Sequence, residues 1–267
     1  MRISVITATW NSGKTIEDTI KSVLHQRYMN IEHIIKDGES KDNTLDICED
    51  YKQKFYKSSD SPSAVVKTMK ILSDKDKGIY DAMNQGIEAA TGDVIGILNS
   101  DDFFTSDDVL QRVSEEFQED PELEALYGDI HFVKDENLNK CTRYFSSKYF
   151  CPWTLRFGFM PAHPSFYVRR EVYEKYGLYD LQYRTSSDFE MMVRLFVKYK
   201  IRTKYINKDF VTMRSGGEST AGIKAKRKVN QDIASSLKKH GVYSNQIFQC
   251  LRYIWRIGEL VYTKIHF

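Results

Sequence analysis

The sequence predicts an α/β fold in which a mostly parallel central sheet carries helices on both faces. Two observations predict it: strand-like and helix-like segments alternate through the first hundred residues, and a polar cluster follows each expected strand. Alternation of this kind is typical of parallel sheets covered on both faces. A length of 267 residues suffices for one large domain, or one domain plus a tail.

The spacing of apolar residues predicts each element of the first part. Short apolar runs bounded by polar residues indicate strands, and apolar residues three and four apart indicate helices. The first expected helix has Ile16, Ile20, Val23 and Leu24 at helical spacing. The expected strands are 2–8, 31–37, 65–74 and 93–102, and the expected helices are 14–26, 44–55 and 79–90.

The second part is less regular. Strands are expected over 125–133, 163–170 and 203–214, and helices over 171–176 and 186–199. From about residue 221 the pattern is helical again. We therefore predict one catalytic domain over 1–220 and a C-terminal helical extension over 221–267.

Charge is distributed unevenly. Residues 221–267 contain nine Lys/Arg and two Asp/Glu, a net of +7; because the whole chain carries +2, the first 220 residues carry −5. A basic tail on an acidic body indicates a polyanionic partner or an anionic membrane. No nucleic-acid partner is expected.

Cysteine spacing and the N-terminus favour a cytoplasmic protein. The four cysteines are far apart and form no Cys-x-x-Cys pair, which indicates neither a zinc site nor a disulfide framework. The chain begins at once with a strand, and no uncharged apolar run reaches the roughly 18–20 residues that span a bilayer. We expect neither a signal peptide nor a membrane span.

The stretch "ATWNSGKT" at 8–15 fits a relaxed phosphate-loop pattern, which would indicate an ATPase. A true phosphate loop uses glycines to wrap backbone N–H groups around phosphates. Here Thr9, Trp10 and Asn11 occupy the loop, and the strand over 93–102 reaches Asn99 where an ATPase would carry a metal-binding Asp. The pattern is more simply the start of a helix.

Polar clusters follow the first four expected strands. They are Thr9 and Asn11, then "DGESKDNT" at 37–44, then "DKDKGIYDAMNQG" at 74–86, then "NSDD" at 99–102. Because ligands of parallel sheets bind beyond the carboxyl ends of the strands, these clusters are expected to meet at one edge.

These clusters, together with "SVITATWNSGKTIEDTIKSVLHQ" at the start and "SSDFEMMVRL" at 186–195, resemble family-two glycosyltransferases. That family is a large inverting group with the GT-A fold. The likeness is greatest to bacterial enzymes of capsule, O-antigen and exopolysaccharide assembly, and it covers about residues 1–217. The order and spacing of the motifs make the set more specific than any single one.

The first three clusters are candidates for binding a nucleoside-diphosphate sugar. Residues at the end of the first strand are placed to hold the nucleoside. The family's matching Asp in the second cluster accepts a hydrogen bond from uracil, although an Asp there also suits a helix cap or turn. The third cluster closes over the nucleotide in the family, and some of its members are expected to serve only as turn and cap residues. The candidates are Thr7, Thr9, Asn11, Asp37, Asp76, Gly78, Asp81 and Asn84.

The "NSDD" cluster is the candidate metal site. A divalent cation stabilises the charge that develops on a departing nucleoside diphosphate, and Mg²⁺ or Mn²⁺ needs only one or two protein carboxylates. The family pattern is Asp-x-Asp; here Asn99 replaces the first Asp. Asp101 is then the principal ligand, with Ser100 in the donor site and Asp102 possible behind it, unless these acids merely cap the next helix.

Asp188 matches the position of the family's catalytic base. Inversion is a single displacement, so one carboxylate must take the proton of the attacking hydroxyl. The alternative is an acid placed by the dipole at a helix N-terminus. Glu190, two residues on, is expected to point elsewhere.

Two further segments resemble parts of the family site. His163 matches a segment near the acceptor, although a structural histidine is equally compatible. Arg214, Gly216 and Gly217 resemble a loop that closes over the donor phosphates, and glycines suit such a lid. A plain surface loop is the alternative.

The segment 247–265 reads as an amphipathic helix. One side carries the polar residues Gln249, Arg252, Arg256, Glu259 and Thr263, and the other carries Leu251, Ile254, Trp255, Val261 and Tyr262. Such a helix can lie in a membrane interface. It can equally pack on the catalytic domain or on a second copy.

Taken together, the sequence predicts a metal-dependent inverting glycosyltransferase that uses a nucleoside-diphosphate sugar, UDP being favoured, and a carbohydrate or lipid-linked acceptor. A non-catalytic homologue and a nucleotidyltransferase stay as alternatives, the latter disfavoured because "TATWNSG" lacks a Gly-rich loop. No Gly-x-Gly-x-x-Gly follows the first strand, which argues against a dehydrogenase. The donor sugar, the acceptor and the oligomeric state are left open.

Overall fold

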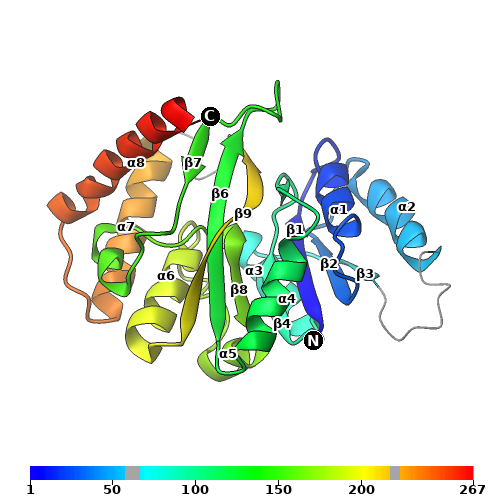
Figure 1. The fold of residues 1–267 in the computed structure, drawn as a ribbon, viewed down its shortest axis with the longest axis horizontal. Helices are drawn as coiled ribbons and strands as arrows, with labels where there is room; N and C mark the ends of the chain where they lie inside the picture. The colour runs from blue at the N-terminus through cyan, green and yellow to red at the C-terminus, as the bar shows by residue number, and fades with distance from the viewer. Residues whose placement is uncertain (58–66, 217–222, 267) are drawn as a thin grey trace.

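The structure, a computed structural model, describes residues 1–57, 67–216 and 223–266 (Figure 1). Helices lie on both sides of a central sheet, as the sequence predicts. The two ends of the chain lie at opposite ends of this view.

The first part contains four parallel strands joined by helices. The strands lie side by side in the order β3-β2-β1-β4, and all three pairs are parallel. Their carboxyl ends therefore meet at one edge. The elements are β1 (Ile3–Thr9), α1 (Ile16–Leu24), β2 (Ile31–Asp37), α2 (Thr44–Lys57), β3 (Thr68–Ser73), α3 (Ile79–Ala89) and β4 (Val94–Ile97).

The second part extends the same sheet with mixed pairing. Strand β8 is antiparallel to both β4 and β6, whereas β6 and β9 are parallel. The elements are β5 (Phe103–Phe104), α4 (Val109–Glu119), β6 (Ala125–Val133), β7 (Arg143–Phe145), the 3₁₀ helices η1 (Pro152–Phe157) and η2 (His163–Ser165), β8 (Phe166–Arg169), α5 (Arg170–Tyr176), α6 (Ser187–Val193), the π-helix η3 (Arg194–Tyr199), β9 (Thr203–Arg214), α7 (Ile223–Lys239) and α8 (Gln246–His266).

The complete order is β3-β2-β1-β4-β8-β6-β9-β5, with β7 paired to β6, which gives nine strands among the described residues. Parallel pairing thus dominates the first part only. Strands β5 and β7 were not predicted, because segments of two and three residues are too short to show an alternating pattern.

Both faces of the sheet are buried. Ile6 and Ile34 pack with α3 and α6 on one face, whereas Ile3 and Val5 pack with α4 on the other. Gly86 allows α3 to lie close to β1, because a Cβ there would meet Ile6 Cγ2 at 2.4 Å. This close contact fixes the start of α3, and the polar cluster before it, at the edge of the sheet.

Three predicted boundaries differ from the structure. Strand β4 ends at Ile97, and the "NSDD" residues form a turn in which Asp102 N donates to Asn99 O at 3.1 Å. Residues 163–165 are 3₁₀-helical rather than extended, because Pro164 has no N–H for a sheet ladder. The helix predicted over 186–199 changes from α to π at Arg194, whose side chain is held by backbone carbonyls.

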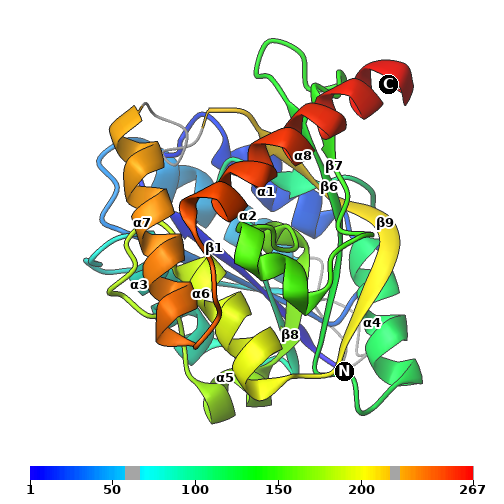
Figure 2. The ribbon, with the colours of Figure 1, turned by 90° about the vertical axis from the view of Figure 1, so that its left-hand side faces the viewer.

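The C-terminal extension packs against the domain. Ile233 and Leu237 of α7 join the core formed by α3 and α6. Helix α8 runs along the outside, past β7 and η1 (Figure 2). The predicted boundary at 220/221 falls outside the described residues, as does Gly217, which was predicted to belong to a lid. No helix in the described ranges combines the length and apolar character needed to cross a bilayer.

Candidate active site

The structure brings the polar clusters of the first four strands together. Ser12 Oγ, after β1, lies 2.8 Å from Ser100 Oγ, after β4. Asn11 N donates to Ser40 Oγ, after β2, at 2.8 Å. Asp37 accepts a hydrogen bond from Ser73 Oγ, at the end of β3. The predicted convergence on one edge is therefore confirmed by direct contacts.

The three candidates after and within β1 have different surroundings. Thr7 is fully buried, and its Oγ1 lies 3.0 Å from His33 Nε2. It therefore joins β1 to β2 inside the sheet. Thr9 Oγ1 is buried without a hydrogen-bond partner and lies at the strand end. Asn11 is exposed, has a φ of 50°, and its Oδ1 accepts a hydrogen bond from Lys41 N. Thr9 and Asn11 are thus the pair that lies at the strand end.

Asp37 is fully buried at the end of β2. Its carboxylate accepts hydrogen bonds from Ser40 N (3.1 Å), Ser40 Oγ (2.5 Å) and Ser73 Oγ (2.8 Å). In this structure it therefore holds the turn after β2, the role that the sequence left as the alternative.

Lys36 is a buried cation that sequence reasoning missed. Its side chain is 0% exposed, and Nζ donates to the carbonyls of Asp37, at 2.8 Å, and Asp74. Nζ also lies 3.9 Å from Asp76 Oδ2. Lys36 thus ties the turn after β2 to the turn after β3. The sequence feature that could have identified Lys36 is the presence of a lysine within the predicted strand "IEHIIKD".

The cluster before α3 divides into two groups. Asp76 Oδ1 accepts from Gly78 N, and Asp81 Oδ2 accepts from Lys77 N, both at 2.9 Å, so these acids order the turn. Gly78 precedes α3 with a φ of 120°. Asn84 is buried and exchanges two hydrogen bonds of 2.9 Å with the backbone of Tyr179. Asn84 therefore positions the segment before α6 and does not face a ligand.

The "NSDD" turn is acidic and half-buried, and Asp102 is its fully buried member. Asn99 Nδ2 donates to Asp102 Oδ2 at 2.9 Å. Burial raises the pKa of Asp101, and the Asp135 charge acts in the same direction while Arg214 opposes it. Burial, and then the charge of Asp101, hold the pKa of Asp102 well above its ordinary range. A cation bound beside these two carboxyl groups would favour their charged forms.

Arg214 already contacts this acidic turn. From the end of β9 its Nη1 donates to Asp101 O at 2.7 Å, and it pairs with Asp18 Oδ2 at 2.5 Å and Asp135 Oδ1 at 3.0 Å. Its side chain is only 8% exposed. Arg214 therefore braces the turn in this structure. Gly216, two residues on, has a φ of 134°, which favours glycine.

The residues of this turn fit a divalent cation. Asn99 Oδ1 is buried without a hydrogen-bond partner, and Asp101, two residues along the same turn, is half-buried. Oxygen ligands are those that Mg²⁺ and Mn²⁺ prefer. In the described part of the chain, no three His, Cys, Asp or Glu side chains are grouped to hold a metal alone. Such a turn suits an ion whose remaining ligands come from substrate phosphates and water.

Asp188 lies in the first turn of α6 and is partly exposed. Its Oδ1 accepts hydrogen bonds from Tyr80 Oη at 2.9 Å and from Phe189 N at 2.8 Å. Tyr80 belongs to α3, so Asp188 faces the helix that carries the second half of the third polar cluster. The available signal for Tyr80 was its place inside the "DKGIYDAMNQG" motif.

His163 belongs to the same neighbourhood. Its Nε2 lies 2.5 Å from Tyr179 Oη, and the Tyr179 ring lies 5.5 Å from the Tyr80 ring. Burial lowers the pKa of His163, although the Asp188 charge acts in the opposite direction. His163 is only 8% exposed, so it packs beneath the surface against Tyr179. Tyr179, which no motif indicated, joins His163 to the Asn84 contact.

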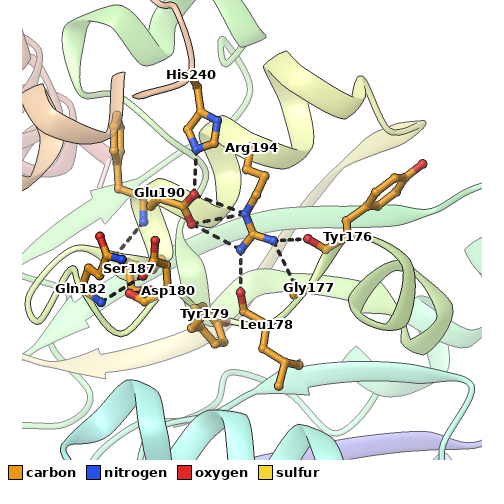
Figure 3. Close-up of polar contacts among 12 residues, drawn as sticks. Tyr176, Gly177, Leu178, Tyr179, Asp180, Gln182, Ser187, Glu190, Arg194 and His240 are labelled. Carbon is orange, nitrogen blue, oxygen red and sulfur yellow. Dashed lines mark hydrogen bonds and ion pairs between the residues drawn. The ribbon is translucent and has the colours of Figure 1, made fainter. Parts of the chain in front are cut away.

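Glu190 points away from this site, as the sequence predicts. It is fully buried and pairs with Arg194, while His240 Nε2 lies 2.7 Å from its Oε1 (Figure 3). Arg194 also donates to the carbonyls of Tyr176, Gly177 and Leu178. This network holds α6 against the turn before it and against the end of α7. Asp188 is therefore the carboxylate of this helix that is open to a substrate.

The sequence model of the family described as "Glycosyl transferase family 2" matches residues 4–177. The chain belongs to this family. The match includes the first four polar clusters and ends before α6, so it does not cover Asp188 or Arg214. The resemblance drawn from the motifs is thereby confirmed, and the protein is a glycosyltransferase.

Two relatives show how far the likeness extends. "PGL/p-HBAD biosynthesis glycosyltransferase" of Mycobacterium bovis is 28% identical over 204 residues, covering 76% of this chain and 73% of the relative. The Escherichia coli protein WfaP, named "UDP-Glc:alpha-D-GlcNAc-diphosphoundecaprenol beta-1,3-glucosyltransferase", is 26% identical over 254 residues. That match covers 94% of this chain and 91% of WfaP, and thus extends beyond the family match.

Solved structures agree on the fold. S. aureus TarS 1-349 in complex with UDP-GlcNAc has a TM-score of 0.62 at 18% identity, covering 91% of this chain and 68% of that one. Mannosyltransferase PcManGT from Pyrobaculum calidifontis, with GDP-Man and Mn²⁺, has a TM-score of 0.63 at 16% identity, covering 98% and 73%. The glycosyltransferase described here has the GT-A fold.

Proposed function

We propose that this glycosyltransferase is an inverting, metal-dependent enzyme that transfers a sugar from a UDP-sugar to a carbohydrate or lipid-linked acceptor in the synthesis of a cell-surface polysaccharide. The observation that carries the proposal is the nearly full-length match to WfaP, whose name states a UDP-glucose donor and a diphosphoundecaprenol-linked acceptor. The fold alone does not indicate which nucleobase the donor carries, because one structural neighbour holds UDP-GlcNAc and another holds GDP-Man.

The "NSDD" turn supports the donor half of the proposal. Asp101 is the protein ligand proposed for Mn²⁺ or Mg²⁺, with the free Asn99 Oδ1 available to the metal or to a ribose hydroxyl. When bound there, a divalent cation supplies charge neutralisation for the leaving diphosphate. Ser100 lies 2.8 Å from Ser12, and this contact joins the turn to the end of β1, where Thr9 lies.

Asp188 supports the acceptor half. The hydrogen bonds from Tyr80 Oη and Phe189 N fix its orientation, while its partial exposure leaves it accessible. A carboxylate so placed can take the proton from an acceptor hydroxyl as it attacks. One base and no covalent intermediate give inversion of configuration.

The proposed acceptor and the proposed cellular location both follow from the match to WfaP. A diphosphate-lipid acceptor is presented at a membrane surface. This agrees with the prediction of a cytoplasmic protein that contacts the inner face of the membrane through residues 247–265. The linkage position and the donor sugar depend on contacts that no residue described above determines.

A calorimetric titration tests the donor half. UDP, GDP and dTDP are each added with and without Mn²⁺ to the wild type, to Asp101→Ala and to the control Asp107→Ala. Asp107 follows the same turn but pairs at the surface with Arg27 at 3.0 Å. We expect Mn²⁺-dependent UDP binding that Asp101→Ala abolishes and Asp107→Ala retains.

The other outcomes separate the parts of the proposal. Preference for GDP or dTDP would overturn the UDP assignment but keep the enzyme class. Equal binding with and without Mn²⁺ would overturn metal dependence. No binding of any nucleoside diphosphate would overturn the proposed activity in favour of a non-catalytic homologue.

A further inference from the structure

Helix α8 docks onto the domain through its polar side. Thr263 Oγ1 accepts a hydrogen bond from Tyr144 N at 2.8 Å, and Glu259 pairs with Arg143 at 3.9 Å, both partners belonging to β7. Gln249 and Thr263 are buried, and the Glu259 side chain is 9% exposed. Three of the five recurring polar residues, Gln249, Glu259 and Thr263, therefore face the protein.

The apolar side of the same helix faces solvent. Among the described residues, fifteen large hydrophobic side chains are exposed, and eight of them lie in α8. They are Ile247, Leu251, Trp255, Ile257, Leu260, Val261, Tyr262 and Ile265. A helix that packs on a globular domain normally turns its apolar side inward. Here the orientation is reversed, so a partner outside the described chain must favour the apolar side.

Two exposed aromatic residues near η1 extend this surface. Trp153 and Tyr149 are 56% and 66% exposed, and η1 packs against α8. The Tyr149 ring lies 6.1 Å from the Trp255 ring, which joins the two segments into one surface (Figure 2 shows α8 along the outside). We call these ten side chains, eight from α8 and two near η1, the outer apolar surface. Aromatic residues of this kind are enriched where a membrane meets water.

The charges around the outer apolar surface have one sign. Residues 143–162 and 240–266 contain six Lys/Arg and one acid, Glu259, which is buried against Arg143. Of the basic residues, Lys148, Arg256 and Lys264 are exposed, and the Arg156 guanidinium lies 4.8 Å from the Trp153 ring centre. An apolar surface bordered by cations complements an anionic bilayer.

We propose that the outer apolar surface binds directly to an anionic phospholipid bilayer, with α8 lying in the plane of the interface. A second copy of the chain fits less well. A two-fold contact brings the same surface from each copy together and would place these basic residues opposite one another. The bilayer instead solvates the apolar side chains and neutralises the Lys and Arg groups. The proposal rests on this surface and not on the donor chemistry proposed above.

Vesicle flotation without any nucleotide tests the proposal. Wild-type protein is mixed with phosphatidylcholine vesicles that contain or lack phosphatidylglycerol. A triple variant carries Ile247→Asp, Ile257→Asp and Ile265→Asp, at positions that are 74%, 61% and 71% exposed, so that folding is retained. The matched control carries Met29→Asp and Leu181→Asp, at positions that are 45% and 41% exposed away from α8.

We expect the wild type and the control to float with phosphatidylglycerol vesicles, and the triple variant to lose at least about tenfold in partitioning, because each acid would enter the apolar layer. Vesicles lacking phosphatidylglycerol, or high salt, should weaken binding. Equal flotation of wild type and triple variant would overturn the proposal. So would light scattering that shows a wild-type dimer which the triple variant dissociates, since that result would assign the surface to a second copy. UDP titration of each variant reports folding and tests the donor site separately.

Discussion

The two halves of the sheet position their site residues by different means. In the parallel half, β1 to β4, each polar group lies directly after the strand that precedes it, and the sheet edge brings the groups together. In the mixed half, the important groups are positioned by contacts with distant elements: Asp188 by Tyr80, and Arg214 by Asp18. Local sequence is therefore sufficient to bring the strand-end groups to one edge, whereas the positions of Asp188 and Arg214 depend on tertiary packing.

The largest effect expected from this comparison is that of Asp188→Asn. The change keeps the shape and the Tyr80 contact but removes the base, so kcat should fall by about 10² to 10⁴-fold. UDP binding, which depends on the parallel half, should stay within about twofold. Steady-state kinetics and calorimetry measure the two quantities. A loss of UDP binding equal to the loss of kcat would contradict the division between the halves.

Glu190→Gln should show the opposite pattern. It removes the charge paired with buried Arg194, so the free energy of unfolding should fall by on the order of 3 kcal/mol, as when a buried ion pair loses one partner. The kcat of the folded fraction should change little. Urea unfolding measures the loss, with the exposed pair Arg170–Glu174 as a control, where Glu174→Gln should cost under about 0.5 kcal/mol. A stable but inactive Glu190→Gln variant would contradict this prediction, because it would indicate that Glu190 takes part in catalysis.

Lys36→Met tests whether the parallel half depends on its own buried cation. The change leaves the carbonyls of Asp37 and Asp74 without their donor, so the two turns should separate and the Kd for UDP should rise about tenfold. The value of kcat at saturating donor should change less, because Lys36 positions the turns and does not touch the reacting atoms. Lys70→Met, on exposed β3, is the matched control. Unchanged UDP affinity would remove Lys36 from the site.

The smallest effect concerns the attachment of α8. Burial raises the pKa of Glu259 to about 7, against the opposing charges of Arg143 and Arg256. A raised carboxyl pKa means that this group stabilises the docked helix fully below about pH 4.5 and that the contribution is lost as pH rises through about 7. Hydrogen exchange of α8 amides should therefore show less protection at pH 8 than at pH 6 beyond the intrinsic rate.

Glu259→Gln should remove that pH dependence, whereas Glu122→Gln, at an exposed position, should retain it. If the variant and the wild type lose protection equally between pH 6 and pH 8, another group controls the docking of α8.

The success of the sequence analysis follows the same division. The strand-end clusters, the α/β alternation and the direction of Glu190 away from Asp188 could be predicted because each depends on spacing within one segment. Lys36, Tyr80 and Tyr179 could not, because their roles arise from partners that spacing does not identify. The amphipathic pattern over 247–265 predicted the two sides of α8, but only the contacts with β7 show which side faces inward. The role of Asp37 as a turn anchor was left open for the same reason.

Arg214 also has a consequence for the order of assembly. It lies 196 residues from Asp18, with which it pairs, and β9 completes the sheet beside β5 and β6. Contacts between such distant parts of a chain form slowly, because a long loop must close first. During synthesis the acidic turn after β4 emerges long before the arginine that braces it. A nascent chain therefore brings Arg214 to the acidic turn only after β9 has been synthesised.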